Sequence, residues 1–372
     1  MAIGELMESA KRLAAVPEQA SAHYETQQGA MSALVNGELR SRADLSRLIG
    51  GNPWEVMETN HAHHCAFMST VFSLRRYDLL AATLPWVYRA YHGRGFSYDY
   101  FPVELDAWAR AVERCLPADQ LSEILAVYAW MKEHHREIIR LAEAAEPEAA
   151  ASAPDAWAQV RQRYLRALLA GDPAEALVVA REIRLPEELE GFYLSVIQPA
   201  MYRVGTLWEA GTISVAEEHL ASAITVRVVA GLAGLRKIGR PWRGLTVVSA
   251  VPHELHVLGA WMVSDLLEMD GWQVRYLGAD TPLEDLLALV KSQRPSMLAL
   301  SVTMPFNLPW ARKIIAAVKA EQASTPVTVM VGGGAFDLLP DLWRAVGADA
   351  WAGNARDAVI GARCYSAPEP MR

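Results

Sequence analysis

The spacing of apolar residues changes along the chain near residue 244. Before it, apolar positions recur every three or four residues, most clearly over 81–91 and 121–141, which predicts amphipathic helices. After it, short β-rich runs alternate with amphipathic segments; the runs cover 245–251, 273–277, 297–302, 327–331 and, weakly, 348–352. This alternation predicts a doubly wound α/β domain, whose parallel sheet carries helices on both faces.

Two stretches without periodicity divide the chain. Residues 142–154 are mostly Ala, Glu, Pro and Ser and are typical of a linker, while 238–244 hold the Gly and Pro residues that stop a helix. We therefore expect a helical domain over 1–145, a four-helix bundle over 155–238 and the α/β domain over 244–366. Within the bundle, helices are expected to begin at Asp155, at Asp172-Pro173, at Leu185-Pro186 and at Ser214.

Composition narrows the functional classes. The net charge of −8 argues against a general nucleic-acid or anionic-membrane surface. The three cysteines lie far apart, which fits neither a disulfide framework nor a zinc site. The first residues form an amphipathic pattern rather than an apolar leader, and no uncharged apolar stretch reaches about 18 residues. We expect a cytoplasmic protein that does not associate with membranes.

Chemically distinctive residues fall at the ends of three predicted strands. His256 follows the first strand, Ser301 and Thr303 end the third, and Gly332-Gly333 ends the fourth. In an open α/β sheet, ligands bind outside the carboxyl ends of the strands. A lone histidine there is ordinarily a core or surface residue, and a Gly run is ordinarily a turn. The combination, in this order, is what indicates a binding site.

The loop Glu254-Leu255-His256-Val257-Leu258-Gly259, with Ser301-x-Thr303 and Gly332-Gly333, resembles the cobalamin-binding domain family. In that family the loop usually has the sequence Asp-x-His-x-x-Gly, so Glu254 replaces an aspartate and is one methylene longer. The resemblance implies that His256 is the lower axial ligand of cobalt and that Glu254 orients its imidazole. Leu255 and Gly259 belong to the same cofactor-binding loop. The displaced dimethylbenzimidazole tail would lie beside Ser301, Thr303, Gly332 and Gly333.

The bundle carries a second motif, Trp208, nine residues, then Glu218-His219. It resembles the light-sensing cobalamin bundles of CarH-type photoreceptors, which implies adenosylcobalamin as the cofactor. Trp208 would cover the adenosyl group, Glu218 would bond it, and His219 would lie beside them. The plain alternatives are a Trp208 in the bundle core, a Ser214–Glu217 capping box and an exposed Glu218–His219 pair.

One position departs from that motif. Glu209 stands where the relatives have a histidine that becomes the upper cobalt ligand after light breaks the cobalt–carbon bond. A bis-histidine light state formed by that route is therefore not expected. His219 or water is left as the upper ligand.

The N-terminal domain has no basic recognition helix, so direct DNA binding is not expected. It contains His61-Ala62-His63-His64 and an aromatic turn over 92–102. Together they suit a planar tetrapyrrole. Alternatively, the histidines lie on a solvated helix face and the aromatic turn fills the core. A globin-like domain ahead of this cobalamin module resembles the photocobilins. That resemblance implies biliverdin as a second chromophore, attached through Cys65 or held without a covalent bond.

These resemblances imply a light sensor, and no catalytic pair in the sequence indicates an enzyme. Photolysis would change the assembly of a homo-oligomer that signals through an unidentified downstream partner. The alternatives are a corrinoid methyl carrier serving a separate methyltransferase, against which Trp208 and Glu218 argue, and a cobalamin-dependent antirepressor. A mutase would need a substrate barrel of about 250 residues, for which the chain has no room. His134-His135 with Glu133 lacks the His-Glu-x-x-His spacing of a zinc enzyme.

Overall fold

The computed structural model describes residues 2–144, 156–237, 239, 242–321 and 326–366. These residues form two compact units. The first comprises 2–144 together with Leu207–Thr212, and the second comprises 156–206 with the described residues from Ile213 onward. Asp155, most of the expected linker over 142–154 and part of the expected boundary over 238–244 lie outside the described residues.

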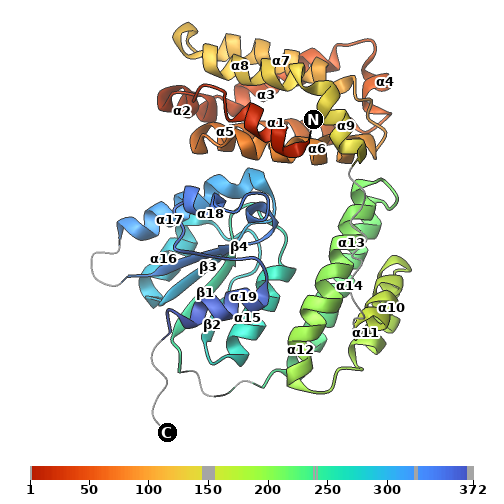
Figure 1. Ribbon diagram of the computed structural model, residues 1–372, viewed down its shortest axis with the longest axis vertical. Helices are drawn as coiled ribbons and strands as arrows, with labels where there is room; N and C mark the ends of the chain where they lie inside the picture. The colour runs from red at the N-terminus through yellow and green to blue at the C-terminus, as the bar shows by residue number, and fades with distance from the viewer. Residues whose placement is uncertain (1, 145–155, 238, 240–241, 322–325, 367–372) are drawn as a thin grey trace. The chain divides into compact units, whose positions relative to one another are not determined.

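The described part of the first unit is helical, as expected (Figure 1). Its elements are α1 (Ile3–Ala10), α2 (Glu18–Thr26), α3 (Gln28–Arg40), α4 (Leu45–Ile49), α5 (Trp54–Leu74), α6 (Tyr77–His92), α7 (Tyr100–Cys115), a 3₁₀ turn (Ala118–Gln120), α8 (Ser122–Glu133) and α9 (His135–Ala144). The likeness of this unit to a globin stays a prediction.

The helical segment predicted over 121–141 is divided at His134 into α8 and α9. The backbone there has φ −91° and ψ 7°, outside the helical range. The His134 ring bonds the Trp130 carbonyl through Nδ1 at 2.9 Å and packs on the Trp130 ring. The Trp130 carbonyl also accepts from the His134 N–H at 3.1 Å, so the ring shares the last ladder bond of α8. Apolar spacing continues through the break, so the pattern alone does not reveal it.

The core of the first unit contains a buried polar cluster. His61 of α5 bonds Tyr100 through Nε2 at 2.7 Å, and Glu104 of α7 accepts from Trp108 Nε1 at 3.1 Å. The His61 ring nitrogen lies 3.9 Å from the Glu104 carboxylate. Burial raises the pKa of Glu104 to about 7 and lowers that of His61 to about 4. Both groups are therefore mostly uncharged between about pH 4 and pH 7.

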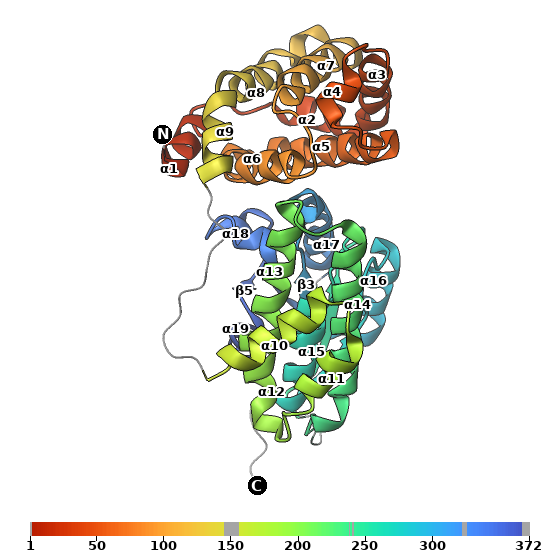
Figure 2. The ribbon, with the colours of Figure 1, turned by 90° about the vertical axis from the view of Figure 1, so that its right-hand side faces the viewer.

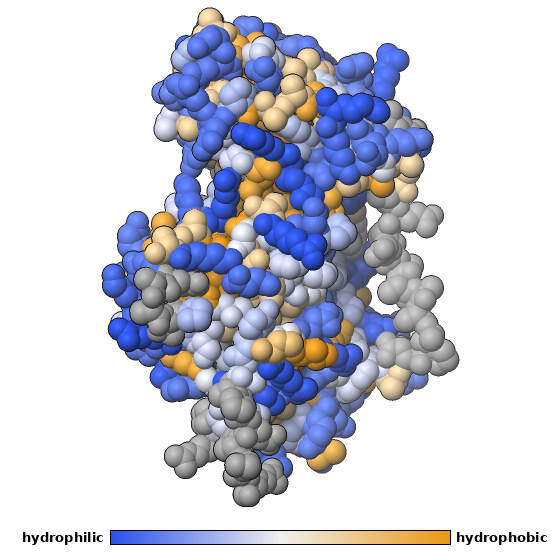
Figure 3. Space-filling model, turned by 60° about the vertical axis from the view of Figure 1, so that its left-hand side comes forward, coloured by the Kyte–Doolittle hydropathy of each residue, from blue (hydrophilic) through white to orange (hydrophobic). Residues whose placement is uncertain are grey.

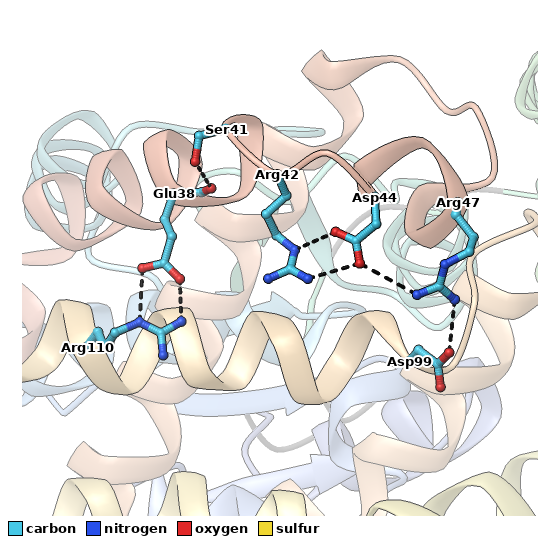
Figure 4. A network of polar contacts seen from close by, with 7 residues as sticks. All are labelled: Glu38, Ser41, Arg42, Asp44, Arg47, Asp99 and Arg110. Carbon is cyan, nitrogen blue, oxygen red and sulfur yellow. Dashed lines mark hydrogen bonds and ion pairs between the residues drawn. The ribbon is translucent and has the colours of Figure 1, made fainter.

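The surface of the first unit is tied by ion pairs (Figure 4). Arg42 donates two hydrogen bonds to the Asp44 carboxylate, at 2.9 and 3.0 Å. Arg47 bonds Asp99 at 3.1 Å, and Arg110 forms an ion pair with Glu38. Such exposed pairs contribute about 0–1 kcal/mol each. Figure 3 likewise shows hydrophilic side chains over most of the visible face, with apolar ones scattered among them.

The second unit begins with a helical bundle, named here for its elements α10 to α14 (Figure 2). They are α10 (Ala158–Leu169), α11 (Pro173–Ala180), α12 (Pro186–Phe192), a π-helical turn (Tyr193–Ile197), α13 (Gln198–Glu209), α14 (Val215–Gly231) and a closing 3₁₀ turn (Ala233–Leu235). Asp172 caps α11 by accepting from two backbone N–H groups, and Ser214 caps α14. These two caps, and Pro186 at the first position of α12, explain why three of the expected helix starts were found from sequence.

The α/β part has five parallel strands in the order β2-β1-β3-β4-β5. The strands are β1 (Leu245–Ala250), β2 (Gln273–Tyr276), β3 (Met297–Ser301), β4 (Thr328–Gly332) and β5 (Ala350–Ala352). The helices are α15 (Leu258–Met269), α16 (Leu283–Gln293), α17 (Leu308–Ala320), α18 (Leu342–Ala345) and α19 (Ala355–Arg363), with 3₁₀ turns at Pro305–Asn307 and Gly334–Phe336. This confirms the doubly wound parallel sheet.

The strand order reverses between β1 and β3, which are neighbours in the sheet although β2 lies between them in sequence. Helices α15 and α19 pack together on one face, and α16 and α17 pack together on the other (Figure 1). The loops after β1 and β3 therefore leave toward opposite faces. Such a switch point is where open α/β sheets bind their ligands.

One helical stretch among the described residues, Val215–Leu235, is long and apolar enough to cross a membrane by length and composition. A core helix passes the same test. In this stretch Ile224, Thr225 and Val228 are buried in the bundle.

We predict that Glu104→Gln stabilises the first unit increasingly as pH rises. A raised pKa means that folding favours the protonated form, so the wild type loses stability as pH rises from about 4.5 to about 7. Gln keeps an acceptor for Trp108 but has no charge to bury. The gain should be near zero at pH 4 and about 3 kcal/mol at pH 8.

Chemical denaturation across this pH range measures the difference. His61 and His64 titrate in both proteins, so their contribution cancels. Glu113→Gln, an exposed glutamate of the same helix, is the control and should change little. A gain for Glu104→Gln that does not depend on pH would contradict the prediction.

Candidate functional site

His256 lies in the loop between β1 and α15, at the switch point of the sheet. Its Nδ1 is 2.5 Å from Glu254 Oε1, and its backbone N–H donates to the same oxygen at 3.1 Å. The His256 side chain is 57% exposed, whereas that of Glu254 is 1% exposed. The ring is therefore oriented from one side by a buried carboxylate and presents its Nε2 edge outward.

The second oxygen of Glu254 reaches the loop after β3. Oε2 accepts from the backbone N–H of Thr303 at 2.8 Å, from that of Met304 at 2.9 Å and from Asn307 Nδ2 at 3.2 Å. Burial by itself would raise the pKa of Glu254, but the hydrogen bonds and charge of His256 and the hydrogen bond from the Met304 N–H lower it to about 2. The bond that His256 donates to Glu254 in turn raises the pKa of His256. The carboxylate is thus ionised and holds the proton of His256 on Nδ1.

Asn307 is a site residue that sequence reasoning missed. It is buried, and its amide donates both to Glu254 and to the His253 carbonyl at 3.3 Å. It lies 53 residues after Glu254 and belongs to none of the motifs. Nothing in its local sequence distinguishes it from an ordinary residue ahead of a helix.

Two non-glycine residues in these loops have left-handed backbones: His253 with φ 63° and Asp280 with φ 47°. The Asp280 carboxylate accepts from the His253 N–H at 2.7 Å, and the Asp280 N–H donates to the Glu254 carbonyl at 3.1 Å. Such conformations persist where surrounding bonds enforce them, and they cluster at functional sites. Here they lie on both sides of Glu254.

The other strand-end residues sit at the same sheet edge. Ser301 pairs in register with Gly332 and with Ala250. At Gly333, φ is 99° and a Cβ would lie 2.4 Å from the Val302 carbonyl oxygen, so only glycine fits. A Cβ at Gly259 would meet nothing within 4 Å. Thr303 is half-buried and Leu255 is 72% exposed, which leaves the edge open beside His256.

The start of α14 places Glu217, Glu218 and His219 in different settings. Glu217 completes the expected capping box with Ser214. Glu218 instead accepts from Ser222 Oγ at 2.8 Å and contacts His219 Nδ1 at 2.7 Å. Its charge contributes to the raised pKa of His256, so the two side chains are within electrostatic reach. The neighbouring His219 side chain is 74% exposed.

Trp208 and Glu209 end α13 in the segment grouped with the first unit. The Trp208 indole lies beneath the Arg94 guanidinium, 3.7 Å from carbon to ring centroid. Arg89 contacts Glu209 at 3.4 Å. Both side chains are half-buried, so Trp208 is not a core residue of the bundle.

In the first unit, the histidine cluster is only partly solvated: His63 is exposed and His64 is half-buried. His61 is fully buried, and the ring of His64 stacks on Trp108 at 4.8 Å. Burial lowers the pKa of His64 to about 3 and raises that of the Cys65 thiol to about 12. A buried thiol of that kind is inert, which argues against attachment of a ligand through Cys65.

Among the described residues, no group of three or more His, Cys, Asp or Glu side chains is placed to hold a metal ion. His256 therefore suits a metal that brings its other ligands with it, as cobalt does in a corrin. A fixed imidazole, an exposed Nε2 edge and a glycine-lined sheet edge fit that group.

Family models agree with this geometry. Two models, each described as a B12 binding domain, match residues 244–362 and 160–242. Dimethylamine corrinoid protein 3 of Methanosarcina acetivorans is 31% identical over 191 residues, which are 51% of this chain and 87% of that protein. The transcriptional repressor CarH of Myxococcus xanthus is 35% identical over 106 residues, 28% of this chain and 35% of CarH.

The solved structure of the monomethylamine corrinoid protein of Methanosarcina barkeri matches 56% of this chain and 99% of its own. Its TM-score is 0.50 at 19% identity, which shows a shared fold. With the sheet-edge histidine, the matching models and a relative covered over most of its length, the chain belongs to the family of cobalamin-binding corrinoid proteins.

Proposed function

We propose that this protein is a light sensor that binds adenosylcobalamin and acts without catalysing a reaction. The observation that carries the proposal is Glu218, a polar side chain on the bundle within electrostatic reach of His256. A carboxylate there suits the hydroxyl and amino groups of an adenosyl ligand. Bound adenosylcobalamin supplies a cobalt–carbon bond that visible light breaks.

Each site residue has a role in this proposal. His256 would hold the cobalt, and Glu254, with Asn307 behind it, would fix the tautomer and direction of the ring. Leu255, Gly259, Ser301, Thr303, Gly332 and Gly333 would line the side that receives the corrin and its tail. By resemblance to the CarH-type bundles, Trp208 would cover the adenosyl group and Glu218 would bond it, with His219 next in the chain.

Photolysis would change the assembly of a homo-oligomer and so reach a downstream protein. In the light state, Glu209 cannot supply an imidazole, so His219 or water is the remaining upper ligand. We also propose that the first unit holds biliverdin without a covalent bond. The buried histidines and aromatic rings of α5 and α7 support this proposal, and the buried Cys65 disfavours attachment.

A second candidate function is methyl transfer. It is favoured by the dimethylamine corrinoid proteins, whose match covers both the bundle and the sheet. In that case the protein would carry a methyl group for a separate methyltransferase. A cobalamin-dependent antirepressor, supported by the match to CarH, would differ from the light sensor only in its partner.

Illumination separates the two candidates. The protein loaded with adenosylcobalamin in the dark should lose the adenosylcobalamin spectrum under green light and change its elution volume in gel filtration. Protein loaded with methylcobalamin is the control. If green light leaves elution unchanged and methylcobalamin binds more tightly than adenosylcobalamin, the methyl carrier is the better account.

His256→Ala should remove the axial nitrogen that the protein supplies. In the cobalt(II) form, that nitrogen splits the EPR lines. Labelling histidine with ¹⁵N should alter the splitting in the wild type, since only a protein nitrogen carries the label. His253→Ala, an exposed histidine of the same loop, should keep the label-dependent splitting. A labelled wild type with the unlabelled pattern would show that the ligand comes from the cofactor tail.

Biliverdin binding is tested by co-expression with haem oxygenase. A red-absorbing band should appear and persist when Cys65 is replaced by Ala, because the thiol is not the attachment point. Loss of the band on acid denaturation and extraction would show a non-covalent pigment. A band that stays with the denatured chain in wild type and vanishes in Cys65→Ala would contradict the assignment.

A further inference from the structure

Within the second unit, the bundle and the α/β part share an apolar core. Met262 and Leu266 of α15 and Ala355 of α19 are buried among bundle residues such as Val196 and Val228. Apolar contacts are non-directional, so they hold two surfaces together without fixing how one sits along the other.

One buried carboxylate interrupts this interface. Asp265 of α15 is 2% exposed. Its Oδ2 accepts from the Tyr193 hydroxyl at 2.6 Å, and its Oδ1 accepts from Arg236 Nη1 at 2.6 Å. Arg236 also bonds Glu268 of the same helix at 2.7 Å. We call Tyr193, Asp265 and Arg236 the Asp265 node.

The two donors come from different elements of the bundle. Tyr193 opens the π-helical turn between α12 and α13, and Arg236 follows the 3₁₀ turn that ends the α14 region. The acceptor lies on α15, which begins two residues after His256. A single carboxylate therefore ties two helices of the bundle to the helix that continues from the His256 loop.

The π-helical turn is itself held on its other side. The Gln198 N–H bonds the Tyr193 carbonyl, and Arg161 Nη1 of α10 donates to the Ser195 carbonyl at 2.8 Å. π-helical turns are rare and are frequent at functional sites. Here the turn is clamped between α10 and α15.

We propose that the residues of the Asp265 node are positioning residues that set the register of the bundle on α15, and with it the placement of Glu218 relative to His256. Sliding the bundle would take Tyr193 and Arg236 away from the buried Asp265 carboxylate, which is unfavourable. The interface therefore has one preferred register rather than a continuum. The inference rests on the cobalamin binding of this family and not on light sensing.

Tyr193→Phe tests the node, because it removes one hydroxyl and keeps the ring. Tyr164→Phe is the matched control: its buried hydroxyl bonds Thr225 at 3.1 Å, and both residues belong to the bundle. Full-length wild type and variants are titrated in the dark with adenosylcobalamin and with aquocobalamin, and binding is followed by visible absorbance.

Tyr193→Phe should weaken adenosylcobalamin binding about tenfold, the size expected for one hydrogen bond to a charged group, with little change for aquocobalamin. Only the ligand with a bulky upper group requires the bundle to be in register. Tyr164→Phe should leave the ratio of the two affinities as in the wild type. An equal loss for both cofactors, or the same change of ratio in Tyr164→Phe, would overturn the proposal.

Hydrogen exchange of the cofactor-free proteins provides a readout that does not need cobalamin. Tyr193→Phe should speed exchange in the π-helical turn and in α15, while Tyr164→Phe should not affect α15. If exchange in α15 were unchanged in Tyr193→Phe, the proposal that the Asp265 node fixes the interface would be refuted. If the wild type bound no cobalamin at all, the proposed function would fail, and the exchange measurement would still decide whether the node fixes the interface.

Discussion

The candidate site depends on the carboxylate of Glu254. It is buried, yet it accepts from five N–H groups: the backbone and ring of His256, the backbone of Thr303 and Met304, and the amide of Asn307. A carboxylate has about four lone-pair positions, so its capacity to accept is filled. The favourable bonds offset the loss of hydration that would otherwise keep such a charge out of the interior.

Glu254 is one methylene longer than the aspartate that is usual in this loop, and the arrangement gives that length a function. One oxygen of Glu254 serves the loop after β1, and the other serves the loop after β3. The carboxylate therefore fixes the imidazole and joins the two loops of the switch point at once. The left-handed backbones of His253 and Asp280 belong to the same arrangement, since both are bonded to each other or to Glu254.

Much of the fold was predictable because it is set by local pattern. The five strands were found within one or two residues, and the caps at Asp172 and Ser214 marked helix starts. The break at His134 was missed because a side-chain bond to a carbonyl leaves the apolar spacing intact. In the same way, Asn307 was missed because its role is set by a partner 53 residues away.

The histidines of α5 show a different reason for failure. His61 is buried and the half-buried His64 stacks on a ring, and a sequence cannot show whether a polar residue has partners in a core. His61 is compatible with burial only because Asn36 and Tyr100 bond both of its nitrogens. These two partners come from two other helices, α3 and α7, and only the fold brings them together.

The strand order determines which segments of the chain can change in sequence without changing the site. His256 and the Ser301 strand end are neighbours because β1 and β3 pair directly, while β2 lies at the outer edge of the sheet. The excursion through β2 and α16 reaches the site through Asp280, which is bonded to His253 and Glu254. Insertions, deletions and surface changes in β2 and α16, away from Asp280, can accumulate while the binding chemistry is preserved. The region is suited to distinguish one corrinoid protein from another by its partners rather than by its cofactor.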